Sequence, residues 1–302
     1  MTQFVFHYDL EHPELCLKAA PILAELHQKY NIPATFFMLG TVLEKKGPEL
    51  KRIFGDSPLF DIQSHTYAHK VLRPSRMHGP AVDLDTLRSE IELGKRLVED
   101  VFERPCIGIR SPYGYSNGFR GDAERLAVIA ETGIEYLSSD LRGPADSIPA
   151  GLVQAYWYDL EGYPQLLELP GHGWHDNVLK QHPDRTHHWL ALPWPTPLRW
   201  GIPSRPTQTP EEEFAVQKVW LNKAIEFKLD YFSPVYHPHS VYRSDPSCRV
   251  IELLMRHVRE REIPTTTYSE LNRRYRESPE LVPGRDAWQF DDPLADRAFA
   301  IG

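Results

Sequence analysis

His65 and His69 stand four positions apart in a segment that follows a short apolar stretch, Leu59–Gln63, expected to form a strand. Two imidazoles at this spacing, on one side of the turn after a strand, can reach a single divalent ion. Imidazole is the commonest protein ligand for zinc and its neighbours. The spacing therefore predicts a metal centre at this turn.

Reactive polar side chains also follow four other segments that are expected to form strands. They are Asp9 and Glu11, then Arg110 and Tyr113, then Asp140, and finally His237 and His239. In (β/α) barrels the catalytic groups lie at the carboxyl ends of the strands. Two histidines and one carboxylate leave open positions on a metal ion for water and substrate, an arrangement that suits metal-assisted hydrolysis.

Strand-like segments alternate with amphipathic segments through most of the chain, which is typical of parallel strands joined by helical crossovers. Strands are expected at residues 3–9, 34–39, 59–63, 106–109, 134–138, 166–169, 230–236 and 263–267. Helices are expected at residues 15–30, 42–54, 84–102, 123–131, 211–228, 248–261 and 269–277. This rhythm predicts one α/β domain over residues 1–302, a distorted TIM-like (β/α) barrel with seven or eight parallel strands.

Two segments lack this periodicity. Residues at about 170–210 are rich in proline, tryptophan and histidine, and such a long aperiodic insertion is typical of a functional loop or lid. Its tryptophans, Trp174 among them, either stack on a flat ligand or fix the loop to the domain. The tail at about 278–302 either wraps the domain or meets another subunit of a homo-oligomer.

The composition narrows the classes of partner. The chain has 302 residues, 41% hydrophobic content and a formal net charge of −8, which provides no basic surface for nucleic acid or an anionic membrane. A small molecule or a glycan is the expected partner. Cys16, Cys106 and Cys248 are widely spaced and read as reduced thiols, and no secretion signal or long apolar run is evident, so a cytoplasmic protein is expected.

Taken in order, these motifs resemble the polysaccharide deacetylases, the carbohydrate esterase type with a NodB-homology domain. The resemblance covers roughly residues 3–270 and rests on Asp9/Glu11, His65-Thr66-Tyr67-Ala68-His69, Arg110-Ser111-Pro112-Tyr113-Gly114, Asp140 and Val235-Tyr236-His237. Two of these motifs resemble those of particular branches of the family. The acids Asp9 and Glu11, separated by one residue, and the pair His237-Pro238 are similar to motifs in branches with peptidoglycan-deacetylase-like and allantoinase-like members.

The resemblance implies hydrolysis of a non-peptide amide bond, in most members an N-acetyl group of a sugar or glycan. Glu11, His65 and His69 would hold one divalent ion, for which zinc is favoured and cobalt, nickel or manganese are alternatives. Asp9 would be the base and His237 the acid, and the backbone N–H of Tyr113 would stabilise the oxyanion. Arg110 and Asp140 would form a buried pair that orients the base, and Tyr115, Trp174 and His239 are candidates for substrate contact.

Several alternatives remain open at this stage. Asp9 rather than Glu11 could be the metal carboxylate, in which case Tyr8 falls at the position of the base. Either acid could instead cap the following helix, and Arg110 with Asp140 could be a purely structural ion pair. The substrate could be a cyclic amide or ureide hydrolysed without a metal, or the chain could be a non-catalytic glycan-binding barrel.

Overall fold

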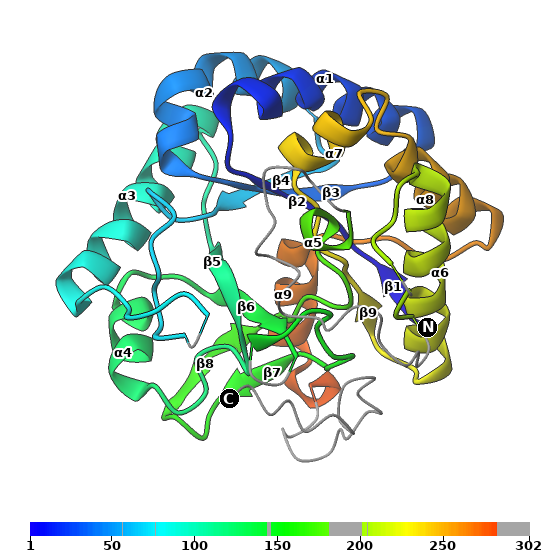
Figure 1. Cartoon of the computed structure of the whole chain (residues 1–302). Coiled ribbons are helices and arrows are strands. Elements are labelled where there is room, and N and C mark those ends of the chain that lie inside the picture. The colour runs from blue at the N-terminus through cyan, green and yellow to red at the C-terminus, as the bar shows by residue number, and fades with distance from the viewer. Residues whose placement is uncertain (56, 76, 144–145, 181–200, 204, 283–302) are drawn as a thin grey trace.

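A mainly parallel sheet lies at the centre of the structure, a computed structural model, and helices surround it (Figure 1). The structure describes residues 1–55, 57–75, 77–143, 146–180, 201–203 and 205–282. The strands are β1 (Gln3–Phe4), β2 (Phe6–Leu10), β3 (Ala34–Met38), β4 (Phe60–Ser64), β5 (Gly108–Ser116), β6 (Tyr136–Arg142), β7 (Tyr156–Tyr158), β8 (Tyr163–Glu168) and β9 (Tyr231–Phe232). Seven of them form one sheet in the order β2-β3-β4-β5-β6-β8-β7, and β1 pairs with β9.

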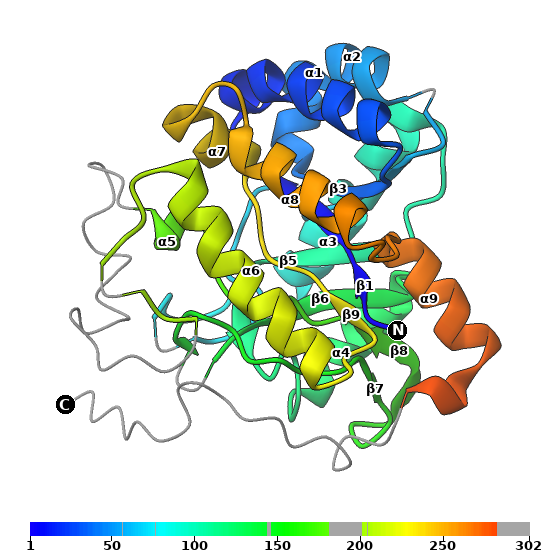
Figure 2. The ribbon, with the colours of Figure 1, turned by 90° about the vertical axis from the view of Figure 1, so that its right-hand side faces the viewer.

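The helices connect successive strands and cover the outside of the sheet (Figures 1 and 2). They are α1 (Pro13–Tyr30), α2 (Gly40–Phe54), α3 (Leu84–Phe102), α4 (Ala123–Glu131), α5 (Asp176–Leu179), α6 (Pro210–Glu226), α7 (Pro238–Ser244), α8 (Arg249–Glu260) and α9 (Tyr268–Glu277). Four of them begin at an aspartate or threonine whose side chain accepts a backbone N–H of the first turn, namely Asp83, Asp122, Thr209 and Thr267. These caps satisfy N–H groups that have no partner within the helix, and they explain why the sequence located these helices closely.

Strands β2 and β3 are buried on both faces, as expected of parallel strands between helices. The rings of Phe36, Phe54 and Phe60 pack together between the strands and α2, with Phe36 and Phe54 centroids 4.2 Å apart. This packing supports the register of β2, β3 and β4. The register in turn determines which side chains lie at the carboxyl ends of these strands.

The ring of strands is completed by single backbone hydrogen bonds. Val5 N donates to Phe232 O and Asp9 N to Tyr236 O, each at 2.9 Å, so residues 232–236 lie beside β2. On the other side, His172 N donates to Ser233 O at 2.8 Å. The carboxyl ends of β2, β4 and β5 and the segment before α7 therefore meet at one end of the ring.

The α/β fold with a parallel-dominated sheet confirms the predicted class, with differences in detail. No continuous ladder closes the barrel among the described residues, and β7 pairs with β8 in the antiparallel direction, so the prediction of seven or eight parallel strands was too regular. The strand predicted at 230–236 shortens to β9, and the strand predicted at 263–267 is a single bridge from Phe4 to Thr265. Pro234 and Pro264 lie inside these segments, and proline cannot donate to a ladder.

The insertion and the tail are only partly described. In the insertion, His182, His187, His188, Trp189, Trp194 and Trp200 lie outside the described residues, and so does the tail from residue 283. Residues 279–281 form a short 3-10 helix. In the described part of the chain, no helix combines the length and the apolar character needed to span a bilayer.

Candidate active site

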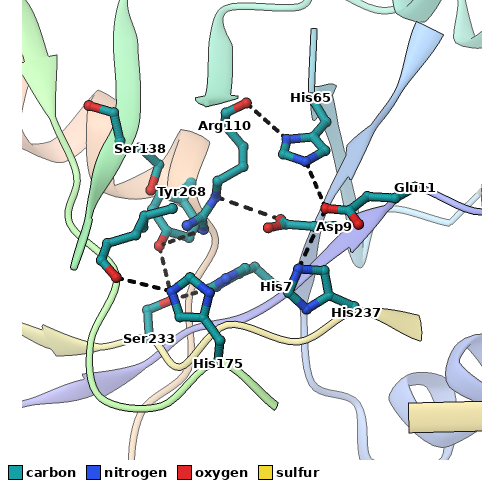
Figure 3. A network of polar contacts seen from close by, with 12 residues as sticks. His7, Asp9, Glu11, His65, Arg110, Ser138, His175, Ser233, His237 and Tyr268 are labelled. Atoms are coloured by element: carbon teal, nitrogen blue, oxygen red, sulfur yellow. Dashed lines mark hydrogen bonds and ion pairs between the residues drawn. The ribbon is translucent and has the colours of Figure 1, made fainter. Parts of the chain in front are cut away.

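The carboxylate of Glu11 lies between imidazoles at the end of the strand ring. Its Oε1 is 3.2 Å from Nε2 of His65 and 3.5 Å from Nε2 of His237 (Figure 3). The same oxygen is 3.1 Å from Nε2 of His69. Burial by itself would raise the pKa of Glu11, but His69 and His237 beside it lower that pKa well below its usual value. Glu11 is therefore ionised, and its oxygen faces nitrogen atoms that can bind a cation.

The donor set fits a divalent metal ion. One ligand atom each from Glu11, His65 and His69 lies within 4.8 Å of the other two. Nδ1 of His65 is 2.9 Å from the carbonyl oxygen of Arg110, to which only a protonated Nδ1 can donate. In the neutral ring, Nε2 of His65 then carries the lone pair and faces Glu11, as a metal ligand must.

The turn that carries the two histidines is held by its neighbours. The first two N–H groups of α2, at Gly40 and Thr41, donate to the carbonyls of Thr66 and Tyr67 at 2.8 and 2.9 Å. Thr66 and His69 both have a positive φ, 67° and 59°, a conformation that non-glycine residues adopt only where their surroundings impose it. The conformation of the turn is therefore set by its packing against the start of α2.

Helix α3 packs closely against the same turn. A β-carbon added at Gly94 would lie 2.6 Å from both Ser64 Oγ and the carbonyl carbon of Thr66. Ser64 Oγ in turn accepts the backbone N–H of Thr66 at 3.0 Å. Gly94 thus allows the helix to approach the backbone that carries His65.

Asp9 lies beside Arg110 on the floor of the site. Its Oδ1 is 3.6 Å from Nε of Arg110, and both side chains are almost wholly buried (Figure 3). Oδ1 of Asp9 has no hydrogen-bond partner among the described residues, so it remains available to accept a proton. Asp9 and Glu11 are two residues apart and both line the site, but Glu11 is the acid against the imidazoles.

Tyr113 follows the bend in β5. It has φ of 67°, and Gly114 after it has φ of 66°, where a β-carbon would lie 2.5 Å from the Leu141 side chain. The ring of Tyr113 contacts that of His69, with centroids 4.6 Å apart. The Tyr-Gly pair therefore turns the chain sharply beside the histidines.

His237 is oriented by an acid that the sequence did not reveal. Nδ1 of His237 donates to Oδ1 of Asp176 at 2.7 Å, and the backbone N–H of His237 donates to the same oxygen at 3.0 Å. Burial lowers the pKa of His237, but the carboxylates of Glu11 and Asp176 outweigh it and raise that pKa to about 9. With Nδ1 held by Asp176, Nε2 is the nitrogen directed toward Glu11.

Asp176 also belongs to a buried ion-pair network. Its Oδ2 is 3.3 Å from Nζ of Lys180, which is 3.0 Å from Oε2 of Glu213 on α6. Burial raises the pKa of Asp176, but Lys180 and His237 together bring it far below its usual value. A cation on each side therefore keeps Asp176 ionised.

The acids and imidazoles around Glu11 surround one cavity of about 510 Å³, a size that suits a small ligand. Its wall is formed by Asp9, Glu11, Leu39, His65, His69, Ser111, Tyr113, Leu141, Arg142, Ile148, His175, Asn177, Val178 and His237. The predicted residues Asp9, Glu11, His65, His69, Tyr113 and His237 are thus brought together, and their roles remain predictions.

The predicted pair of Arg110 with Asp140 is wrong. Asp140 accepts hydrogen bonds from the Asn117 N–H and the Tyr156 hydroxyl at 3.0 and 3.1 Å, and Arg110 lies against Asp9 instead. Burial and the neighbouring carboxylate of Glu168 raise the pKa of Asp140 to about 7. The bend in β5 separates the two side chains, because its register against β6 shifts after Arg110.

Three predicted substrate contacts lie outside the cavity wall. The hydroxyl of Tyr115 is buried and accepts the N–H groups of Leu72 and Arg73 at 2.9 and 3.0 Å, so it holds the loop after His69. Trp174 is fully buried and donates to Gly201 O at 2.8 Å, which fixes the two ends of the insertion together. His239 is buried in the first turn of α7, with its ring 5.6 Å from that of His237.

Sequence reasoning missed Asp176, Lys180, Glu213 and Arg142. Asp176 and Lys180 belong to the aperiodic insertion, where no strand end marks them, and Glu213 is one of three consecutive glutamates at the start of α6. The four-residue spacing of Asp176 and Lys180 was a usable signal, because an acid and a base at this spacing form ion pairs on a helix.

Comparison with known proteins supports this assignment of fold. Residues 11–137 match the family model described as Polysaccharide deacetylase, a segment that includes Glu11, His65, His69, Arg110 and Tyr113 and ends before His237. No curated protein matches the chain.

Solved structures share the fold at low sequence identity. A polysaccharide deacetylase homologue from Mycobacterium smegmatis has a TM-score of 0.63 and 18% identity, over 95% of this chain and 94% of that one. A second homologue, from Pseudomonas aeruginosa PAO1, has a TM-score of 0.57 and 15% identity, over 86% and 73%. Puue Allantoinase has a TM-score of 0.55 and 14% identity, over 86% and 72%. Residues 11–137 are thus similar to the polysaccharide deacetylase family, and the chain shares the fold of these solved structures.

Proposed function

We propose that the chain is a metal-dependent hydrolase of a non-peptide amide bond, and that it removes the acetyl group from an N-acetylated sugar or glycan. The observation that carries the proposal is the contact of Glu11 with Nε2 of both His65 and His69, beside an Asp9 oxygen that accepts no hydrogen bond from the described residues. Glu11, His65 and His69 would hold the ion. A divalent ion in such a site supplies Lewis-acid polarisation of the carbonyl and lowers the pKa of water.

Asp9 would take the proton from the attacking water. Its carboxylate is buried and lies 3.6 Å from the guanidinium of Arg110. Arg110 is itself held by Tyr268, whose hydroxyl accepts from Nη2 at 3.2 Å. In this assignment Arg110 holds Asp9 in place, the role that the resemblance gave to the pair of Arg110 and Asp140.

His237 would protonate the leaving nitrogen. Its Nδ1–H is held by Asp176, so Nε2 is the atom that carries the transferable proton. The backbone N–H of Tyr113 is the candidate donor to the oxyanion, because the left-handed conformation of Tyr113 turns the backbone next to His69.

The test combines metal content with turnover. The purified protein is depleted by chelation, reloaded with zinc, cobalt, nickel or manganese, and analysed for bound metal and for acetate release from N-acetylated sugars. We expect one ion per chain, a large loss of bound metal in His69→Ala, and no loss in His257→Ala, a histidine on the outer helix α8. Asp9→Asn should retain the ion and lose about 10²- to 10⁴-fold in turnover. Full activity after chelation and dialysis would refute the metal-dependent mechanism.

A cyclic amide or ureide is the second candidate substrate. A cavity of about 510 Å³ with the apolar side chains Leu39, Leu141, Ile148 and Val178 in its wall can accommodate a single small ring. Puue Allantoinase shares the fold, although at 14% identity this likeness concerns the fold alone. Ring opening measured on a cyclic ureide, in parallel with acetate release, separates the two candidates.

A further inference from the structure

Arg142, at the end of β6, is a charged residue in the cavity wall with no role in the chemistry proposed above. Its side chain is almost wholly buried, with 7% of the residue exposed. Burial lowers the pKa of Arg142 to about 10, which still leaves the guanidinium charged at neutral pH. A desolvated cation of this kind is costly unless an anion or several acceptors surround it.

The partners of Arg142 are all neutral atoms. Nε donates to the carbonyl of Tyr113 and Nη1 to the carbonyl of Asp146, both at 2.8 Å, and Nη1 also lies 3.5 Å from the sulfur of Met77. The carboxylate of Asp146 is engaged elsewhere, by Ser116 N–H at 2.9 Å and the Ser75 hydroxyl at 2.8 Å. Across the described ranges, no carboxylate oxygen lies within ion-pair distance of Arg142, and its Nη2 makes no hydrogen bond.

The other charges of the cavity are already matched. Asp9 lies beside Arg110, and Glu11 lies among three imidazoles. The neighbouring His175 adds no positive charge, because burial and Arg142 itself lower the pKa of His175 well below its usual value. Arg142 is therefore the charge in this wall that forms no ion pair with a described residue, and the carboxylate of Asp146 acts on it only from a longer distance, where it raises the pKa of Arg142.

We propose that Arg142 binds a carboxylate of the substrate, so that the molecule hydrolysed here is an amide that carries a negative charge. The inference rests on the proposed function, since it assigns the substrate class of the same site. Guanidinium groups bind carboxylates through short, charge-assisted hydrogen bonds, and Nη2 is the part of Arg142 that is free to donate one. A single carboxylate fits better than a polyanion, because the cavity also holds two acids and the chain carries a net charge of −8.

Matched pairs of ligands test the proposal by calorimetric binding to the metal-loaded protein. The pairs are N-acetylglucosaminuronate against N-acetylglucosamine, and dihydroorotate against dihydrouracil. Within each pair the two molecules share the ring and the amide and differ by a carboxylate. We expect the acid of at least one pair to bind about tenfold or more tightly than its neutral partner, a preference that Arg142→Gln abolishes and Arg142→Lys retains in part.

The control variant is Arg125→Gln. Arg125 is also largely buried and donates to a backbone carbonyl, that of Val82 at 2.8 Å, but it lies outside the cavity wall. It should keep the preference for the acid. If wild type binds both members of each pair equally, or if Arg142→Gln weakens both members by the same factor, Arg142 acts only by holding Tyr113 and the proposal is overturned.

The outcome for the proposed function can be read separately. Hydrolysis of neutral and anionic amides with the same KM would leave the hydrolase intact and remove the carboxylate site. A preference for the acid that depends on Arg142, without any hydrolysis, would support the binding site and reject the enzyme.

Discussion

Asp140 and Asp176 are both buried acids near one end of the same strand ring, yet the charged side chains beside them have opposite signs. Asp140 faces the carboxylate of Glu168 and two neutral donors, and its pKa rises to about 7. Asp176 lies between Lys180 and His237, and its pKa falls far below the usual value. Because burial raises both pKa values, the charge of the neighbours decides which acid can hold a protonated histidine.

The comparison shows why a carboxylate in a motif is a weak guide to its role. Asp140 occupies the position that the motif order favours, after a regular strand. Asp176 comes from a four-residue helix in an aperiodic segment, and it is the acid that accepts a hydrogen bond from Nδ1 of His237. The two acids differ in their neighbours, because Asp176 has the cation Lys180 within ion-pair distance and Asp140 forms no ion pair with a described residue.

The largest expected effect is on turnover in Asp176→Asn. The amide cannot balance the charge of a protonated His237, so kcat should fall about 10²- to 10⁴-fold while the bound metal is retained. Asp140→Asn is the matched control, since the same change of atoms should alter kcat less than about threefold. Equal losses in the two variants would remove the distinction between the two acids.

Lys180→Met tests whether the cation is what sets Asp176 apart. Removing the ammonium leaves the buried Glu213 without its ion pair and Asp176 with His237 alone, so the free energy of unfolding should fall by about 3 to 5 kcal/mol in urea titrations. Lys180→Met combined with Glu213→Gln should regain part of that loss. Lys51→Met is the control, because its 2.8 Å pair with Glu103 is exposed and its loss should leave the free energy of unfolding nearly unchanged. A loss as small as that of the control would contradict the network.

Asp140→Asn should have an effect on stability that depends on pH. Since the pKa of Asp140 is raised to about 7, the folded chain binds this proton more tightly than the unfolded chain. That stabilisation is complete below about pH 4 and is lost as the pH rises through about 7. At pH 8 the free energy of unfolding of the variant should therefore exceed that of wild type by up to about 4 kcal/mol, since the pKa difference is about three units at about 1.4 kcal/mol each. The exposed Asp159→Asn should show no such rise, and a parallel pH profile for wild type and Asp140→Asn would refute the assignment.

The smallest expected effect is that of Tyr115→Phe. It removes the hydroxyl that accepts the Leu72 and Arg73 N–H groups, so the free energy of unfolding should fall by about 1 to 2 kcal/mol with KM unchanged. Tyr163→Phe is the control, because the Tyr163 hydroxyl has no hydrogen bond within the described part of the structure. A rise in KM without loss of stability would return Tyr115 to the substrate site.

The sequence predicted those parts that local chemistry determines. Capped, periodic helices such as Leu84–Phe102 and Ala123–Glu131 have the predicted bounds, and Glu11, His65 and His69 follow regular strands whose carboxyl ends must meet. Asp176 could not be placed in this way, because its position depends on the packing of an aperiodic segment against Val235 and α6. The error at Asp140 has the same origin, since a bulge in β5 is not visible in the periodicity.

Gly94 has a consequence for how this site can vary. Any larger residue there would push against the backbone of Ser64 and Thr66, since even one methyl group meets atoms at 2.6 Å. Displacing that backbone by a few tenths of an ångström would move His65 relative to Glu11. The position of His65 relative to Glu11 therefore depends on the size of a residue in the outer helix layer that lies outside the cavity wall.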